Sequence, residues 1–481
     1  MIRQHEYHDP HIEEKLFAIA EYFSERGPIA FLLSGSRYDS AKHSFLCLFP
    51  YKTISIQGRD LSVFGTGTDE KNIRSDQNPW DMLKNEIGSL SEEHDFPEWI
   101  GYIAYEAGAY HDNTVILDLP KNEYPDFVFS KYAVVIDYEH DTKKVSIRCS
   151  PEEIQKFPKE IRENANKFVD GSVWNESFPQ KKIDLPKVSI EKEPDSPDVF
   201  AEKIMKAKEY IFAGDVYQVN LSHQCRFKGS FSEFDLFKKL HLKNPAPFSA
   251  FLKISDQHTI ISSSPERLLK KENDRLETRP IKGTIQRANN PEEDQKNKAT
   301  LLSSEKDKSE LLMITDLMRN DLGKISLPGT VITPKIWHCE AYSNVFHLLS
   351  VIQSQCIPDL HPVDIVRAVF PGGSITGCPK LRAMEIIAEI EQAPRGIYTG
   401  SIGYFTGKGN FDFNIAIRSP DIYNKKIHLH LGAGIIAESD PAQEYLETLH
   451  KGKSIFESLT GKTSGIRLKG DYDFSNKFNG H

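Results

Sequence analysis

Closely spaced cysteines are missing from this sequence, and their absence excludes the usual cysteine frameworks. The 481 residues contain six cysteines, but no two of them form a C-x-x-C pair. Structural zinc sites and disulfide scaffolds are built on such pairs or on dense, even-numbered cysteines. Single thiols spread along a chain of this size are typical of a reducing compartment, so we expect a cytoplasmic protein.

Long apolar runs and blocks of positive charge are absent as well. No run of roughly eighteen apolar residues, as a membrane-spanning helix needs, occurs in the chain. The polar start MIRQHEYHDPHIEEK lacks the apolar core of a secretory signal. The net charge is −9 and no compact basic block is present, which argues against nucleic-acid binding. We therefore expect a globular protein that binds neither membrane nor nucleic acid.

Changes in composition divide the chain into two parts and a tail. Short apolar segments between 28 and 58 and between 127 and 149 predict strands, the latter as a hairpin around EHDTK. Residues 150–198 are charged and contain prolines, which is typical of a helix followed by a linker. We expect an N-terminal subdomain with its linker over 1–190, a second domain over 191–465 and a frayed polar tail over 466–481.

The second part mixes strands and helices in irregular order. Ser196 and Pro197 predict the start of a helix, and Gly214 is placed to end it. The segment VYQVNLSHQCRF that follows predicts a strand. Because no regular alternation of strand and helix occurs, we expect an α+β fold with a largely antiparallel sheet.

Two predicted helices each place a pair of carboxylates on one face. Asp307 and Glu310 follow a serine pair that can cap a helix, and Glu444 and Glu447 follow an Asp-Pro start. Taken alone, such pairs are typical of solvated helix acids or of an intrahelical ion pair, here with Lys451. Together, the four carboxylates could supply the oxygen ligands that Mg²⁺ prefers, some of them through water.

A glycine-rich turn, PGGSITGCPKLRAMEII over 371–387, runs into another predicted helix. Such a junction presents free backbone N–H groups to a carboxylate or a phosphate. It matches neither G-x-G-x-x-G nor the Walker A pattern, and the late TGKT fails the latter because Phe456 replaces its first glycine. The hexapeptide RPIKGT over 279–284, taken alone, is typical of a surface turn.

The order of these segments resembles that of the chorismate-utilising enzyme family. The N-terminal part matches more weakly, through FLLSGS and GYIAYE. The resemblance implies a two-layer α/β sandwich with largely antiparallel sheets and an active site in the central cleft. It extends from Gln218 to Lys451 and rests on YQVNLS, SSSPERLL, RPIKGT, LMRNDLG, YSNVFHLLS, PGGSITGCPK, GSIGYF, IAIRS and GAGIIAESDP.

The resemblance also implies roles for single residues. Glu310 and Glu447 resemble the main Mg²⁺ ligands, with Asp307 and Glu444 close by, and the metal would hold the ring carboxylate of chorismate. Arginine binds carboxylates through two parallel hydrogen bonds, which suits the enolpyruvyl carboxylate. The implied substrate contacts are Arg418 and Tyr398 at that carboxylate, with Gln218, Thr284, Ser374, Gly434 and Lys451 around the rest of the molecule.

Two positions favour one reaction within the family. Gln218 stands where water-using members have a lysine base, and an amide takes up no proton near neutrality. Lys282 stands where members that aminate the ortho position read P-I-A-G-T, and this lysine is the mark of those that aminate carbon 4. By resemblance, Lys282 attacks ring carbon 2 in its neutral form, Glu266 carries the proton of the departing 4-hydroxyl, and His347 lies near this leaving group. Ortho amination is the alternative.

The source of ammonia is the last expectation. No G-x-C-x-G nucleophile segment is present, so ammonia would come from solution or from a separate glutaminase subunit. The resemblance then implies a product used for para-aminobenzoate and folate synthesis. A silent subunit that only regulates a glutaminase is the alternative from another class, and the intact set of Lys282, His347, Arg418 and Glu310 argues against it. The oligomeric state and a ligand in the N-terminal part stay open.

Overall fold

The computed structural model shows a mixed α/β fold built on a large antiparallel sheet. It describes residues 2–460 except 6–10, 36–37, 39, 67, 91–93, 112–116, 180, 185 and 343. The ladders between the described strands are antiparallel, which confirms the predicted α+β class. The predicted tail over 466–481 lies outside the described residues.

The elements follow one another in mixed order, as the sequence predicts. The helices are α1 (Ile12–Ser24), α2 (Pro79–Ile87), η1 (Tyr105–Tyr110), α3 (Pro151–Gln155), α4 (Lys159–Asp170), η2 (Ser172–Asn175), α5 (Pro197–Ala213), α6 (Glu233–Lys243), α7 (Pro291–Ser303), α8 (Glu305–Gly323), α9 (Pro362–Val369), η3 (Gly373–Ile375), α10 (Lys380–Glu391) and α11 (Pro441–Thr460). The strands up to residue 192 are β1 (Ile2–His5), β2 (Ile29–Leu33), β3 (His43–Gln57), β4 (Asp60–Gly65), β5 (Thr68–Arg74), β6 (Pro97–Ile103), β7 (Phe127–Glu139), β8 (Lys144–Cys149) and β9 (Lys187–Lys192). The later strands are β10 (Gln218–Ser230), β11 (Phe248–Lys253), β12 (His258–Ser264), β13 (Arg267–Glu272), β14 (Arg275–Arg279), β15 (Ile281–Gln286), β16 (Ile332–Ala341), β17 (Val345–Gln355), β18 (Gly377–Cys378), β19 (Ser401–Thr406), β20 (Phe411–Asn414), β21 (Asp421–Tyr423) and β22 (Lys426–Ile435).

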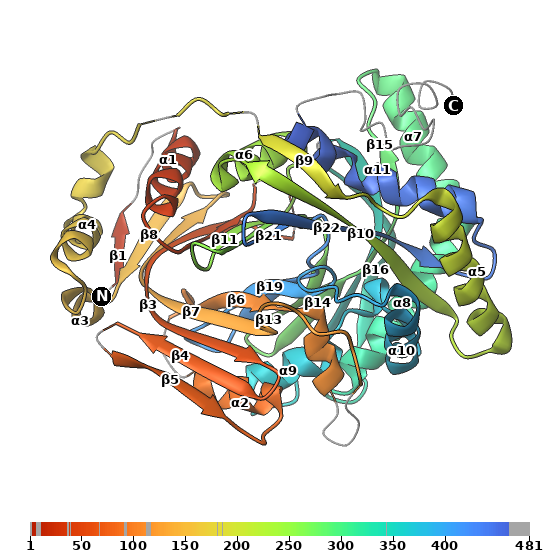
Figure 1. Cartoon of the computed structure of the whole chain (residues 1–481), viewed down its shortest axis with the longest axis horizontal. Coiled ribbons are helices and arrows are strands. Elements are labelled where there is room, and N and C mark those ends of the chain that lie inside the picture. The colour runs from red at the N-terminus through yellow and green to blue at the C-terminus, as the bar shows by residue number, and fades with distance from the viewer. Residues whose placement is uncertain are drawn as a thin grey trace.

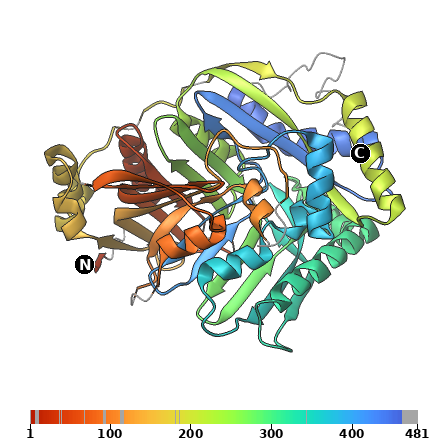
Figure 2. The same cartoon turned by 60° about the horizontal axis from the view of Figure 1, so that its bottom comes forward.

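Strand pairing continues across the predicted boundary near residue 190. β2 pairs with β11, and β6 pairs with β19, so strands of the N-terminal part share hydrogen bonds with strands of the second part. The N-terminal strands, red to orange, still gather at one end of the molecule in both views (Figures 1 and 2). The segment expected as a linker ends in β9, which pairs with β10.

One long strand replaces two short strands that the sequence suggests between residues 43 and 57. β3 pairs with β7 along most of its length, with a register shift between Pro50 and Lys52. Phe49 has a φ of 61°, which explains why the apolar pattern is interrupted at this point. The predicted hairpin of β7 and β8 is confirmed.

Side-chain caps fix the starts of the helices that carry the candidate acids. The Ser304 hydroxyl accepts a hydrogen bond from Asp307 N at 3.3 Å at the start of α8. Asp440 Oδ1 accepts one from Gln443 N at 2.9 Å before α11. Such caps satisfy backbone donors that the first helical turn leaves free. Both pairs of acids therefore lie in or near the first turn of a helix whose start is well defined.

The two largest apolar cores among the described residues are built from different helices. One contains Val219 and Leu221 of β10 with Phe200 of α5 and Leu449 of α11. The other contains Ile314 of α8 with residues of α2, α9, β13 and β17. In Figure 1, α5 and α11 lie beside β10, whereas α2 and α9 lie on the opposite side of the molecule. Helices α8 and α11 thus belong to different cores.

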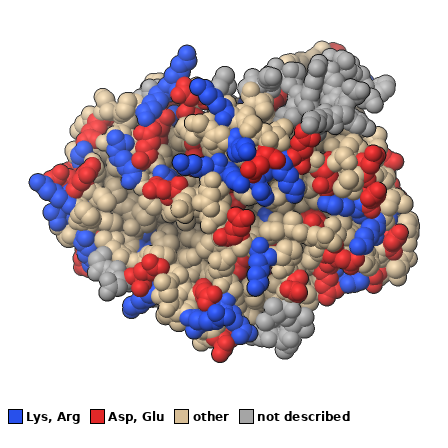
Figure 3. Space-filling model, viewed as in Figure 1, with Lys and Arg blue, Asp and Glu red and all other residues tan. Residues whose placement is uncertain are grey.

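The surface mixes charges of both signs. Lysine and arginine side chains alternate with aspartate and glutamate over the face shown in Figure 3. Within the described part of the chain, no helix is both long and apolar enough to cross a membrane.

Candidate functional site

Lys282 lies in the middle of the candidate site, on β15. Its Nζ atom is 3.8 Å from Glu310 Oε2, and both side chains are 15% exposed. A Cβ atom added to Gly434 would lie 3.0 Å from this Nζ atom and 3.2 Å from Gln218 Nε2. The amine is therefore held between α8 on one side and β22 and β10 on the other. The structure brings these four predicted residues together.

A buried carboxyl group, Glu266, lies beside this lysine. It accepts hydrogen bonds from the Ser374 hydroxyl at 2.7 Å and from Ile281 N at 3.5 Å. Burial raises the pKa of Glu266 to about 7, although the Ser374 hydrogen bond and the positive charges of Lys282 and Lys451 act to lower it. A carboxyl group with such a pKa can take up or release a proton near neutrality.

His347 is buried behind β15 and is neutral. Burial and the positive charge of Arg418 lower the pKa of His347 to about 3. Its Nδ1 atom lies 2.8 Å from the Thr284 hydroxyl, and its Nε2 atom is buried without a hydrogen-bond partner among the described residues. In either tautomer, one ring nitrogen therefore remains for a ligand.

Gln218 is completely buried, and its side chain is also unpaired. Neither its Oε1 nor its Nε2 atom has a hydrogen-bond partner among the described residues. Buried polar side-chain atoms are paired in most proteins, so an unpaired set in one place points to a ligand. Gln218 and His347 provide such atoms, Gln218 beside Gly434 and His347 beside Thr284.

Tyr398 and Arg418 come from adjacent segments. Thr399 N donates a hydrogen bond to Ala416 O at 2.9 Å, which brings the two segments side by side. The Tyr398 ring stacks on His430 at 5.2 Å, and a Cβ atom on Gly432 would lie 2.3 Å from its hydroxyl. Tyr398 therefore faces β22, whereas the positive charge of Arg418 acts on His347.

The four predicted metal ligands lie around the same region, and three of them, Glu310, Glu444 and Glu447, are paired with lysines. Lys306 Nζ is 3.8 Å from Glu310 Oε1 and 4.0 Å from Glu444 Oε1, so it bridges α8 and α11. Burial raises the pKa of Glu444, whereas the Lys451 ammonium, 2.7 Å from Glu447 Oε1, lowers the pKa of Glu447.

Asp307 completes this acidic set from the RPIKGT side. A Cβ atom on Gly283 would lie 2.9 Å from Asp307 Cγ, so this carboxylate packs against the backbone next to Lys282. Among the described residues, no three His, Cys, Asp or Glu side chains converge as a ready metal cluster. The acids of α8 and α11 thus lie on two sides of one region, but their side chains do not converge on a common point.

Two residues in the region of the candidate site were not predicted from the sequence. Lys306 precedes Glu310 by four residues, and this helical spacing was a usable signal for their contact. Arg395 is buried beside Tyr398, with its guanidinium 5.6 Å from the ring centroid. No local pattern distinguishes it from a surface arginine.

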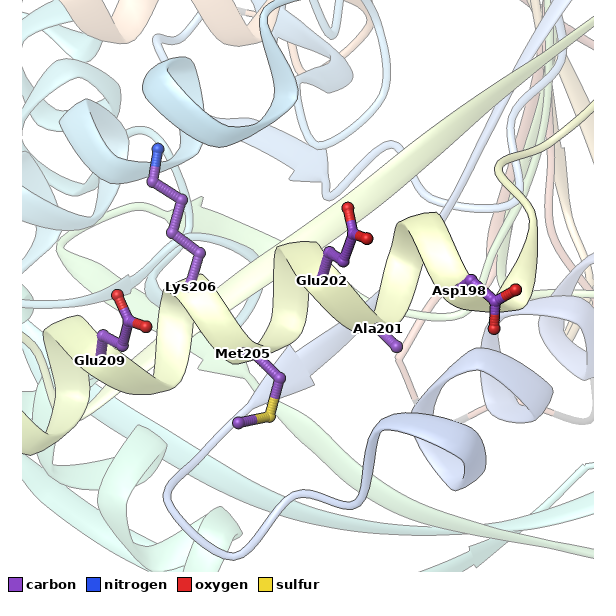
Figure 4. Close-up of a pocket in the computed structure, with 6 residues that line it drawn as sticks. All are labelled: Asp198, Ala201, Glu202, Met205, Lys206 and Glu209. Atoms are coloured by element: carbon purple, nitrogen blue, oxygen red, sulfur yellow. The ribbon is translucent and has the colours of Figure 1, made fainter.

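A surface hollow on α5 lies outside this site. Figure 4 shows that all six side chains lining it come from this single helix. Lys206 forms an ion pair with Glu389 at 2.6 Å, and Met205 is 51% exposed. None of the residues that line this hollow is a predicted functional residue.

Comparisons with known proteins show which proteins this chain is similar to. The sequence model of the family described as chorismate binding enzyme matches residues 35–457. Aminodeoxychorismate synthase component 1 of Escherichia coli (strain K12) is 45% identical over 260 residues, which are 54% of this chain and 57% of that relative. Anthranilate synthase component 1 of Aquifex aeolicus (strain VF5) is 34% identical over 406 residues, 81% of this chain and 80% of the relative.

A solved structure shares the fold. Anthranilate synthase component I from Streptococcus pneumoniae TIGR4 superimposes with a TM-score of 0.74 at 29% identity, covering 88% of this chain and 95% of that one.

The raised pKa of Glu266 predicts a pH-dependent effect of Glu266→Gln on stability. Between pH 4.5, the ordinary pKa, and about 7, the folded protein holds a proton that the unfolded chain has released. Stability from this group is therefore fully present at low pH and is lost as the pH rises through 7. Glutamine does not titrate. The free energy of unfolding of the variant should therefore rise relative to that of the wild type, by up to about 3 kcal/mol between pH 4.5 and about 7.

Urea unfolding at a series of pH values measures this difference. Glu305→Gln, which changes a carboxylate that is 84% exposed, serves as the control. A stability difference between Glu266→Gln and wild type that stays constant from pH 4.5 to 7.5 would contradict the assignment.

Proposed function

Because this chain belongs to the family of chorismate-binding enzymes, we propose that it converts chorismate and ammonia to 4-amino-4-deoxychorismate. The observation that carries the proposal is the placement of the Lys282 amine beside Glu310, Gln218 and Gly434. Support comes from the relative of 45% identity named aminodeoxychorismate synthase component 1. With glutamine as the nitrogen source, the overall reaction is an amino transfer.

Ortho amination, as in anthranilate synthase, is the second candidate, supported by the relative that aligns over 81% of this chain. It gives Lys282 no task, because members of that branch have an alanine at this position. A nucleophilic amine placed among unpaired buried polar groups favours amination at carbon 4.

The reaction proceeds in two displacements. The neutral Lys282 amine forms a bond to ring carbon 2, the two ring double bonds shift, and the bond between carbon 4 and its hydroxyl breaks. Glu266, with a pKa of about 7, gives its proton to the hydroxyl, which leaves as water. Ammonia then attacks carbon 4, the double bonds shift back, and the Lys282 amine leaves carbon 2. One proton from ammonia returns to Glu266.

The remaining residues bind and orient the substrate. Arg418 and Tyr398, on adjacent segments, hold the enolpyruvyl carboxylate. His347 is neutral because it is buried, and its Nε2 atom is available for a hydrogen bond near the hydroxyl that leaves carbon 4. Gln218, Thr284, Ser374, Gly434 and Lys451 surround the ring and its carboxylate.

The acidic residues of α8 and α11 fit a magnesium ion by the chemistry of their donors. Glu310 and Glu447 would bind it directly, and Asp307 and Glu444 would do so directly or through water. When bound, the ion supplies positive charge for the ring carboxylate of chorismate. Lys306, which contacts Glu310 and Glu444 and is 60% exposed, can turn away from them into solvent.

Ammonia comes from a separate glutaminase subunit in this proposal. The sequence contains no G-x-C-x-G segment for releasing ammonia from glutamine, and ammonium salts would replace the partner in a test tube. The protein would act in the cytoplasm, where its six cysteines stay reduced.

Replacement of Lys282 tests the covalent step. Lys282→Ala should abolish amination while chorismate still binds, and Lys282→Arg should also fail, because a guanidinium stays protonated and cannot attack. Mass spectrometry of the wild type with chorismate and Mg²⁺, without ammonia, should show an adduct on the peptide that contains Lys282. An active arginine variant, or an adduct on another residue, would show that the lysine is not the nucleophile.

Gly434→Ala tests the position of the amine. The new methyl group would lie 3.0 Å from Lys282 Nζ and push this flexible side chain aside. We expect kcat/KM for chorismate to fall about tenfold or more, because small displacements of a reacting group are costly. The matched control is Gly323→Ala, where an added Cβ meets no atom within 4 Å. Equal kinetics for both variants would argue against the placement.

Glu310→Gln tests the metal site without measuring turnover. The substitution keeps the size of the side chain and removes one negative charge, so Mg²⁺ affinity should fall about tenfold or more. Calorimetric titration with Mg²⁺ measures it, and Glu305→Gln on the same helix is the control. Unchanged affinity in the Glu310 variant would remove this residue from the site.

A further inference from the structure

Three N-terminal side chains hold a loop that leads to the candidate substrate site. Glu106 Oε1 accepts a hydrogen bond from Arg395 N at 2.7 Å, and its Oε2 atom accepts one from Gly396 N at 3.1 Å. The Tyr124 hydroxyl accepts one from Ile397 N at 3.1 Å. Asn122 Nδ2 also donates to Glu106 Oε2, at 2.5 Å. Three consecutive backbone amides, directly before Tyr398, are therefore fixed by the N-terminal part.

Glu106, Asn122 and Tyr124 together form a clamp, and the loop over 395–397 fits it closely. Gly396 has a φ of +60°, and a Cβ atom there would lie 1.7 Å from the Tyr124 hydroxyl. Only glycine fits both the backbone conformation and the contact. Tyr398 N in turn donates to Arg395 O at 3.1 Å, so the fixed amides continue into a turn that carries Tyr398.

The Arg395 side chain connects this loop to two further segments of the site. Its Nη2 atom donates to Asn220 O at 2.6 Å, two residues beyond Gln218 on β10. Its Nη1 atom donates to Ile375 O at 3.3 Å, directly after Ser374. One guanidinium thus connects the segments that carry two further predicted substrate residues.

The guanidinium has a buried counterion. Arg395 forms an ion pair with Glu391 at 2.7 Å, and their side chains are 1% and 4% exposed. Removing one member of a buried pair leaves a charge that is costly to bury, so this geometry is strongly determined. The Glu106 carboxylate is buried as well, and its four hydrogen bonds with described residues come from amide donors.

We propose that Glu106 is a positioning residue for substrate binding: its carboxylate fixes the loop over 395–397 and thereby sets Tyr398 against the enolpyruvyl carboxylate site. The consequence for chorismate rests on the proposed function, whereas the clamp itself does not. It gives the N-terminal part a direct role in building the site. Because Tyr398 contacts a carboxylate that takes part in no bond made or broken, loss of the clamp weakens binding more than chemistry.

The test compares Glu106→Gln with Glu98→Gln. Glutamine at 106 would turn an NH₂ group toward the amide donors that now face a carboxylate oxygen. Glu98 is a matched control, because it is also a buried carboxylate of the N-terminal part, paired with Lys131 and Arg148 away from the loop. Tyr124→Phe, which removes only the hydroxyl at Ile397 N, is a milder second variant that tests the same clamp if Glu106→Gln does not fold.

Two measurements separate the clamp from the reaction. Hydrogen exchange, followed by mass spectrometry without substrate, should accelerate about tenfold or more in peptides covering 395–397 in Glu106→Gln, and less in Tyr124→Phe. KM for chorismate should rise about tenfold in Glu106→Gln and about threefold in Tyr124→Phe, with kcat changed less than twofold, while Glu98→Gln retains the wild-type KM.

The outcomes are distinct. Unchanged exchange of the loop, or a wild-type KM in both clamp variants, overturns the inference, as does an equal rise of KM in Glu98→Gln. A wild type that exchanges as expected but does not turn over chorismate overturns the proposed function and leaves the clamp standing.

Discussion

The confinement of one amine determines how the rest of this site is arranged. Lys282 Nζ is held between Glu310 on α8 and the backbone of Gly434 on β22, with Gln218 beside it. In the proposed reaction, this nitrogen attacks the substrate as a free amine. The buried Glu266, whose pKa is raised to about 7, can give its proton to the departing hydroxyl. The chemistry therefore depends on how charge is distributed around a single nitrogen.

That distribution follows from the two-core architecture. α8 and α11 belong to different cores, and their acidic first turns meet across a gap that Lys306 bridges. Glu310, Glu444 and Glu447 each contact a lysine, so lysine ammonium groups balance part of the negative charge of this region. The N-terminal part adds the clamp of Glu106 on the loop over 395–397, which joins the sheet system to the substrate-binding side of the site.

Local signals predicted much of the fold, and long-range contacts explain what they missed. The capped starts of α5 and α11 and the hairpin of β7 and β8 follow from side-chain caps and turn residues a few positions apart. β3 forms one continuous strand because it pairs with β7, whose residues come more than seventy positions later in the chain. No local pattern encodes this pairing. The order of short motifs named candidate residues on separate elements, and the structure brings Lys282, Glu310, Gln218 and Gly434 together. The contact of Glu106 with Arg395 spans 289 positions and left no trace in the local sequence.

The most direct measurement is the identity of the product made by the purified chain from chorismate, ammonium and Mg²⁺. The account predicts a product that carries an amino group on carbon 4 and keeps its enolpyruvyl group, formed without release of pyruvate. Chromatography with mass detection identifies it, and a coupled pyruvate assay gives the second readout. Formation of fluorescent anthranilate together with an equal amount of pyruvate would contradict the account and assign the chain to ortho amination.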